Sequence, residues 1–546
     1  MMRQGRLWTA GLLASLVMAG TGCKQGENGG SEAPGVRRTK AAASAEKPPP
    51  PGAPGAGKGT LLAAGRVTDL RVTPDGRFAT YIANGQKPRM DGIPPQMVLG
   101  DLYVVPVTGG EPRKLGEGVT NVPGGQLTAP GSKHVLFLTG YSPTTQSGVL
   151  NVVALDDAKA EPTALGTAVS YMLPSPDGMK LAYVDGGKLK LGALPSGPFT
   201  DVAAEVSTAQ FTPDGKTLLF KRRLSAAGGL AAVSVEKPDA APLKISDQVG
   251  DYEVSPDGQR VAFQVRSESV PGLYDLYLAE LPDLKAKRLA VASGVFGFSP
   301  DSKWLARTEN GKPNVPGDLH LGPASGGAGR KLGVQVEKLA FSPDSQAVGF
   351  LEKYDSTANA GLMSVAALPD GATKQVGGRV PNFVWGADGR HVAFLSRILK
   401  PAYSVDLMLY TLGEEKAAKV QQGVFGYGFT PGNSQVVFRS NCIRNGRSCD
   451  FMALDLPKQA EAPKTWLQGI FSYKISEDGK RLLVTYTRMD SDTYDVAVYD
   501  VKTQARKTLD EGVQVPVSFG GENDSLAVYA ITQGPKAGVY SVPATP

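Results

Sequence analysis

The stretch Val254–Gln264, VSPDGQRVAFQ, contains a short extended segment, a Ser-Pro-Asp-Gly turn and a second apolar segment. Proline suits the second position of a type I turn, aspartate caps the turn backbone, and glycine takes a left-handed conformation at little cost. Apolar residues that alternate on both sides of such a turn are typical of a β-hairpin. The stretch therefore predicts two antiparallel strands joined by a tight turn.

The same pattern recurs about eleven times along the chain. From Pro213 onward its spacings are 43, 44, 43, 44, 44, 46 and 44 residues, whereas the earlier spacings of 56, 46 and 37 indicate insertions and one short unit. Each unit contains four strand-like runs. Equivalent third strands begin at aspartate in Asp101–Val107, Asp406–Leu412, Asp450–Leu456 and Asp495–Val501. A tandem four-stranded unit of about 44 residues predicts the blade of a β-propeller, and hence an all-β fold.

The turn, a following basic residue and an apolar-Ala-Phe run resemble the WD40-like (PD40) repeat of TolB-type β-propellers. Copies stand at 173–184 (LPSPDGMKLAYV), 211–220 (FTPDGKTLLF) and 341–350 (FSPDSQAVGF), degenerate copies stand at 129–137, 386–394, 430–438 and 520–528, and the repeats cover residues 61–546. The resemblance implies an envelope propeller that is used as a docking surface. TolB's own partner is not implied, because a Pro/Gly-rich segment precedes the blades here instead of an α/β domain.

The two ends of the repeat region complement each other. The last unit ends one strand short, and the segment at 59–70 resembles a fourth strand that enters the next unit, so residues 60–65 are expected to complete the last blade. Eleven blades exceed the usual four to eight of one ring. We therefore expect two abutting propellers, with about six blades in residues 61–325, about five in 326–546 and a junction near 320–337. A single large ring is the alternative.

The first 22 residues have the pattern of an export signal, with Arg3 and Arg6 before a mostly apolar run at 7–19 that is too short to span a membrane. The sequence at 19–23, AGTGC, resembles the lipobox of bacterial lipoproteins, which implies lipidation of Cys23 and attachment to a membrane. Lys24 favours the outer membrane under that family's sorting rule. An ordinary secretory signal with a coincidental cysteine is the alternative. The Pro/Gly/Ala-rich composition of residues 23–60 predicts a disordered tether.

Charge and cysteine content agree with export to the cell envelope. The net charge is +6, of which residues 1–60 carry +5, with eight Lys/Arg and three Asp/Glu. The body is therefore close to neutral, which excludes the basic surface expected of a nucleic-acid-binding protein. Cys442 and Cys449 lie seven residues apart in a loop and predict a disulfide in an oxidising compartment. Two free thiols, or half of a metal site, are the alternatives.

No catalytic constellation, metal site or cofactor motif is predicted. Of the three histidines, His134 and His391 share one repeat position and His320 lies on a third strand. The chain has no G-x-S-x-G elbow. The turn aspartates are spread one to a blade, whereas a metal ion needs converging ligands. The peptidase activity of prolyl-oligopeptidase relatives, which share the repeat, is therefore not implied.

Basic and aromatic residues gather at the loops between second and third strands, which lie on one face that we call the long-loop face. Four cations lie at the same repeat position, eight residues after the last turn residue: Arg223, Arg266, Lys353 and Arg397. Three more arginines lie within two positions of it: Arg222, Arg439 and Arg488. Three tyrosines are close by: Tyr354, Tyr403 and Tyr486. Because binding residues favour loops on a rigid scaffold, this face is expected to bind an envelope protein or an anionic glycan. Ordinary charged strand ends are the alternative interpretation. Two other functions stay open: an enzyme such as a polysaccharide lyase or glycosidase, and a small-ligand sensor with a central pocket.

Overall fold

A computed structural model describes residues 58–546 except 89–93, 95, 223–227, 282–283, 399–403, 444–445, 457–460, 489–492 and 533. The chain divides into two units, Met1–Ala53 and Pro54–Pro546, and the described residues all belong to the second. The expected signal, Cys23 and nearly all of the expected tether therefore lie outside the described residues. Among the described helices, none is long and apolar enough to cross a membrane.

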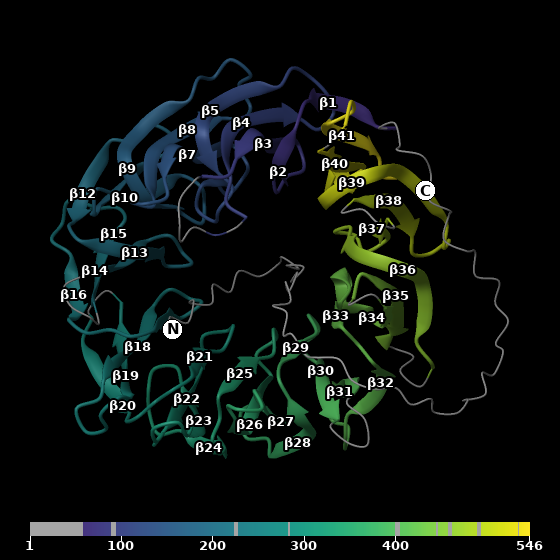
Figure 1. Ribbon diagram of the computed structural model, residues 1–546. Coiled ribbons are helices and arrows are strands. Elements are labelled where there is room, and N and C mark those ends of the chain that lie inside the picture. Colours follow the sequence, from purple (N-terminus) through teal and green to yellow (C-terminus); the bar gives the residue numbers. More distant parts are fainter. Residues whose placement is uncertain are drawn as a thin grey trace, which may run out of the picture. The chain divides into compact units, whose positions relative to one another are not determined.

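The described strands form four-stranded antiparallel blades in which each strand pairs with the next along the chain (Figure 1). Blades one to four consist of β2 (Val67–Val72), β3 (Phe78–Gln86), β4 (Leu99–Pro106) and β5 (Arg113–Thr120); β6 (Gln126–Thr128), β7 (His134–Ser142), β8 (Ser147–Ala154) and the first part of β9 (Thr163–Pro174); the rest of β9 with β10 (Lys180–Asp185), β11 (Lys188–Ala193) and β12 (Phe199–Ala203); and β13 (Val206–Phe211), β14 (Thr217–Arg222), β15 (Gly229–Ser234) and β16 (Leu243–Ser246).

The middle blades keep the same order. Blades five to eight consist of β17 (Tyr252–Val254), β18 (Arg260–Arg266), β19 (Tyr274–Glu280) and β20 (Ala286–Ala290); β21 (Phe296–Phe298), β22 (Trp304–Glu309), β23 (Asp318–Pro323) and β24 (Arg330–Gly333); β25 (Lys338–Phe341), β26 (Ala347–Asp355), β27 (Ala360–Ala367) and β28 (Thr373–Val380); and β29 (Phe383–Trp385), β30 (His391–Ile398), β31 (Ser404–Thr411) and β32 (Ala418–Gln422).

The last blades share long strands and use the N-terminal strand. Blades nine to eleven consist of β33 (Gly426–Phe429), β34 (Gln435–Ile443), β35 (Ser448–Asp455) and the first part of β36 (Lys464–Ile475); the rest of β36 with β37 (Arg481–Thr487), β38 (Tyr494–Asp500) and the first part of β39 (Arg506–Gly520); and the rest of β39 with β40 (Leu526–Ile531), β41 (Gly538–Pro543) and β1 (Thr60–Ala64). Two short 3-10 turns, η1 (Pro431–Asn433) and η3 (Glu522–Asp524), replace the regular turn in blades nine and eleven. The β-propeller prediction is confirmed.

The turn of blade five has the predicted form. The Ser255 hydroxyl donates to Asp257 Oδ1 at 2.5 Å and accepts the Arg260 N–H at 2.9 Å. Asp257 Oδ1 also accepts the Gln259 N–H at 3.0 Å, and Gly258 has a φ of 71°. These bonds satisfy backbone groups that a tight turn leaves unpaired. The turn aspartate therefore has a structural role, as the sequence predicted.

The fourth turn position has a positive φ in all eleven described turns. Glycine fills it in six blades, and Ser132, Ser302, Ser345, Asn433 and Asp524 fill it in the others. In each of these five, the side-chain oxygen accepts a hydrogen bond from a backbone N–H in the preceding blade's turn, donated by Asp75, Asp257, Asp301, Ala387 and Glu477 respectively. A left-handed non-glycine residue costs of order 1 kcal/mol. The bond between neighbouring blades offsets that cost.

The N-terminal strand completes the last blade, as predicted. β1 pairs antiparallel with β41, with Thr60 opposite Ser541 and Ala64 opposite Gly538 (Figure 1). At the entry to β1, Asp510 Oδ2 accepts hydrogen bonds from the Lys58 N–H at 2.9 Å and from the Tyr529 hydroxyl at 2.5 Å. The two ends of the repeat region are therefore held in one sheet.

The core of the described residues consists of eleven clusters of buried side chains, each between two consecutive blades. One cluster joins blades six and seven through residues such as Leu321, Val336 and Phe350. Another joins blades eleven and one through residues such as Tyr81 and Val528. Both faces of every blade are thus covered by a neighbouring sheet.

These contacts match the single large ring, and they correct our expectation of two propellers divided into residues 61–325 and 326–546. In two separate propellers, blade six would pack on blade one. Here the core instead continues through the expected junction near 320–337, where Leu332 and Val336 lie between blades six and seven. The number of blades in a ring depends on the angle at which neighbouring sheets pack, and side-chain interdigitation sets that angle. A regular repeat is compatible with either arrangement, so it does not reveal the ring count.

Candidate functional site

The long-loop face presents two of the predicted cations. In an antiparallel blade, the loop between second and third strands lies at the opposite end from the Ser-Pro-Asp-Gly turn, on the same side as the connection to the next blade. Arg266 ends β18 and Lys353 lies near the end of β26, and both residues are exposed. Lys353 has a φ of 46°, so it marks a local irregularity where β26 departs from regular pairing.

Three other predicted residues make contacts within the fold. The Arg488 side chain is 12% exposed, and its Nη1 lies 2.8 Å from Asp495 Oδ1 and 3.4 Å from Glu511 Oε2. Arg439 Nη1 donates to the Phe471 carbonyl oxygen at 2.5 Å. The Tyr486 ring lies beneath the Arg506 guanidinium, with 5.5 Å from Cζ to the ring centroid. Shared register therefore does not make these side chains equally available.

The remaining predicted residues either lie outside the described residues or are hydrogen-bonded within the fold. Arg223 and Tyr403 lie outside the described residues, as does the side chain of Arg397. Arg222 Nε donates to the Ala204 carbonyl oxygen at 3.2 Å. The Tyr354 hydroxyl is hydrogen-bonded to Asn359. Within the part of the set that the structure describes, Arg266 and Lys353 are the cations that the fold leaves exposed.

The predicted disulfide is confirmed, and it lies beside two exposed apolar side chains. Cys442 is bonded to Cys449 between β34 and β35. Ile443 is 60% exposed, and Phe425, in the connection to blade nine, is 59% exposed. A Cβ placed on Gly446 would lie 3.7 Å from the Phe425 ring, so this ring packs against the bridged loop. We call Phe425 and Ile443 the apolar pair.

The apolar pair was not predicted from the sequence, because the pattern that indicated binding on this face was one of charge. A hydrophobic residue beside a short cysteine-bridged loop was the available signal. Both side chains belong to or lie against the same bridged loop, and exposed apolar patches mark interaction surfaces. The bridge restricts the loop that presents Ile443, which lowers the entropy lost when a partner binds.

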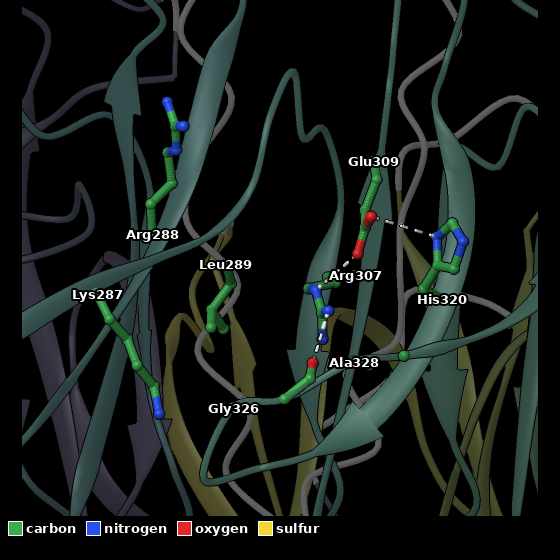
Figure 2. Close-up of a pocket in the computed structure, with 10 residues that line it drawn as sticks. Lys287, Arg288, Leu289, Arg307, Glu309, His320, Gly326 and Ala328 are labelled. Carbon is green, nitrogen blue, oxygen red and sulfur yellow. Dashed lines mark hydrogen bonds and ion pairs between the residues drawn. The ribbon is translucent and has the colours of Figure 1, made fainter.

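A separate hollow of about 460 Å³ lies between blades five and six (Figure 2). Its lining comes from β20, β22, β23 and the glycine-rich turn after β23: Lys287, Arg288, Leu289, Arg307, Glu309, His320, Gly326, Gly327, Ala328 and Gly329. Arg307 Nε donates to Glu309 Oε1 at 3.0 Å, and Nη2 donates to the Gly327 carbonyl oxygen at 3.0 Å. His320 Nδ1 lies 3.9 Å from Glu309 Oε2 and 3.3 Å from the Asp318 carbonyl oxygen.

The other two histidines occupy the same strand position, as predicted. His134 begins β7 and His391 begins β30. Burial and the neighbouring Lys133 lower the pKa of His134, and Asp156 partly opposes that shift. His391 Nδ1 lies 2.5 Å from Asp388 Oδ2 within its own turn. Across the described ranges, no three His, Cys, Asp or Glu residues are grouped so that they could hold a metal ion.

A scan against protein-family models and a search of curated proteins found no match. Similar solved structures include a eukaryotic initiation factor, with a TM-score of 0.41 and 13% identity over 66% of this chain and 93% of that one. The dihydro-heme d1 dehydrogenase NirN has a TM-score of 0.32 and 17% identity, covering 63% of this chain and 72% of its own. An oligogalacturonate lyase from Vibrio parahaemolyticus has a TM-score of 0.31 and 12% identity, covering 60% of this chain and 98% of its own. These similarities concern the fold alone and carry no argument about function.

Proposed function

We propose that this chain is a lipid-anchored binding scaffold of the bacterial cell envelope, and that its long-loop face docks a partner protein. The observation that carries the proposal is the apolar pair, two large exposed side chains beside a disulfide-bridged loop. The disulfide supports an oxidising compartment outside the cytoplasm. The export pattern of residues 1–22 and the lipobox-like cysteine, Cys23, support the anchor.

The chemistry of the face favours a protein over a glycan. Protein interfaces combine a desolvated apolar centre with a polar rim, and aromatic side chains are enriched in the centre. Phe425 and Ile443 supply such a centre, and the exposed Arg266 and Lys353 supply cations on the same face. The expected partner surface therefore has an apolar patch with acidic residues around it. The TolB-like resemblance supports the same class of function.

Docking is tested by capture of envelope proteins on the purified, tethered chain. The double variant Phe425→Asp/Ile443→Asp should reduce recovery of the captured protein at least tenfold, because it places two carboxylates in the apolar centre. A matched control is Leu243→Asp, which charges another exposed apolar side chain on β16. Equal capture by the double variant and the wild type would refute docking through the apolar pair. Selective loss of an acidic glycan, with protein capture unchanged, would assign the face to glycans instead.

The anchor is tested separately by fractionation of cells. Cys23→Ser removes the thiol that lipidation requires, so the variant should move from washed membranes to the soluble envelope fraction. The matched control is Cys442→Ser, which changes a cysteine of the propeller and should stay with the membranes. Retention of the Cys23→Ser variant on washed membranes would show that lipid at Cys23 does not anchor the chain.

A further inference from the structure

One buried repeat position is apolar in ten blades and cationic in blade six. It lies eight residues after the first turn residue, in the second strand. Its occupants are Tyr81, Phe137, Tyr183, Phe220, Phe263, Phe350, Phe394, Phe438, Val484 and Tyr529, all at most 4% exposed, and in blade six Arg307, which is 3% exposed. Ten blades therefore fold without a charged side chain at this position. Burial of a charge costs several kcal/mol unless the charge is well paired.

The residue that faces this position on the third strand also differs between blades five and six. In blade five, Phe263 lies opposite Tyr277, and the two rings stack with centroids 5.8 Å apart. In blade six, Arg307 lies opposite His320. The facing position on the third strand varies among the blades and is polar in others, such as Asn151 in blade two and Ser364 in blade seven. The buried cation on the second strand is therefore the feature that sets blade six apart.

The pairing of Arg307 is incomplete. Its Nε and Nη2 have the partners described above, but Nη1 is buried and has no hydrogen-bond partner among the described residues. An unsatisfied buried donor costs about 1–3 kcal/mol. Such groups are rare in native proteins, and a ligand that the group binds is one physical reason to keep them.

Glycines make the room around this guanidinium. A Cβ on Gly322 would lie 3.1 Å from Nη1, and one on Gly329 would lie 3.4 Å from Nη2. Gly326 has a φ of +79° and packs against the Lys287 side chain. Because this turn has three glycines between 326 and 329, it places no large side chain between Arg307 and the hollow that Arg307 lines.

The lining of the hollow is cationic with one acidic group. Lys287 and Arg288 come from β20, and Figure 2 shows them across from Arg307, Glu309 and His320. Lys287 Nζ donates to the Ser325 carbonyl oxygen at 2.5 Å, and Arg288 Nη1 lies 3.5 Å from Asp275 Oδ2. Three cations and a single carboxylate favour an anionic ligand, while Glu309 and His320 offer hydrogen bonds to hydroxyl groups.

We propose that this hollow binds a sugar acid, with the ligand carboxylate on Arg307 and Lys287 and its hydroxyl groups on Glu309 and His320. A guanidinium matches the planar geometry of a carboxylate. The volume of about 460 Å³ falls in the range of small-molecule sites. This inference goes beyond the docking function, because it concerns a different site and a different class of ligand.

The test is calorimetric titration of the purified chain with D-glucuronate, with D-glucose and with inorganic phosphate. Glucose lacks the carboxylate but keeps the hydroxyl groups, so it should bind at least tenfold more weakly than glucuronate. Absence of glucuronate binding, or equal binding of glucose, would overturn the proposal. Equally tight phosphate binding would also overturn it, because the site would then be a general anion site.

Variants assign the binding to this hollow. Arg307→Met should weaken glucuronate binding at least tenfold, whereas Lys303→Met, at an exposed lysine of the same blade, should leave it unchanged. Lys287 is exposed, so Lys287→Met should fold normally and weaken binding about threefold or more. That second variant keeps the proposal testable if Arg307→Met does not fold. Unchanged affinity in Lys287→Met would place the binding elsewhere, whatever the result for docking.

Discussion

Blades five and six have the same four-stranded arrangement but differ in the side chains buried at equivalent positions. Both have the Ser-Pro-Asp turn, with the serine hydroxyl bonded to the aspartate at 2.5 Å in blade five and 2.6 Å in blade six. Blade five packs Phe263 into the cluster that it shares with blade four. Blade six places Arg307 at the same position, with Glu309 two residues later and glycines opposite. A propeller blade thus accepts a buried charge when several neighbouring positions change with it.

The largest loss of stability is expected when an arginine is placed at the equivalent position of blade five. Phe263→Arg removes a buried ring and buries a guanidinium in its place. The residue two positions later in the strand is Val265, and the residue opposite is Tyr277, so neither supplies a carboxylate. The lost burial and the unpaired charge should together lower the free energy of unfolding by more than about 4 kcal/mol. Urea unfolding followed by circular dichroism measures the change.

Arg307→Met is the matched control for that experiment. It removes a charge that is only partly satisfied, so the free energy of unfolding should change by no more than about 2 kcal/mol. A loss below about 1 kcal/mol for Phe263→Arg would show that blade five accepts the cation equally well. The contrast between the two blades would then have no energetic basis.

A smaller effect on stability, which depends on pH, is expected from Glu253 of β17, which contacts Phe298 of β21 in blade six. Burial raises the pKa of Glu253 to about 7, although the Phe298 N–H, which donates to Glu253 Oε1 at 3.1 Å, opposes the shift. A raised pKa means that the folded state holds its proton more tightly than the unfolded state does. Stability should therefore fall as pH rises from about 4.5, the ordinary value, to about 7.

Glu253→Gln isolates this contribution. Glutamine keeps an oxygen for the Phe298 N–H and cannot ionise, so the variant should be more stable than wild type by about 1–2 kcal/mol at pH 8. At pH 4 the two proteins should unfold at nearly the same urea concentration. Glu280→Gln, at an exposed residue of β19, is the matched control and should show no pH-dependent gain. An equal gain for Glu253→Gln at both pH values would contradict the burial argument.

Local chemistry made much of the fold predictable. The turn motif requires Pro, Asp and Gly at particular backbone angles, and its recurrence every 44 residues indicated blades before any packing was considered. The strand at 60–64 was predicted from its likeness to a fourth strand, and the disulfide from the short spacing of Cys442 and Cys449. The candidate site was less predictable. Arg266 and Arg488 are both basic residues near strand ends, but only the second is held in ion pairs.

The sequence by itself determined the turns, the four-stranded units, the closing strand and the bridged loop, because each depends on residues close together or on a pattern that repeats. Only the tertiary structure decided that eleven blades close in one series, which depends on the packing angle between sheets. It also decided that Arg307 lies buried between two blades, with one nitrogen that has no hydrogen-bond partner in the described part of the chain. The departure from Phe to Arg is visible in the aligned repeats. Its meaning depends on Gly322, Gly327 and Glu309, which the folded chain brings around the guanidinium.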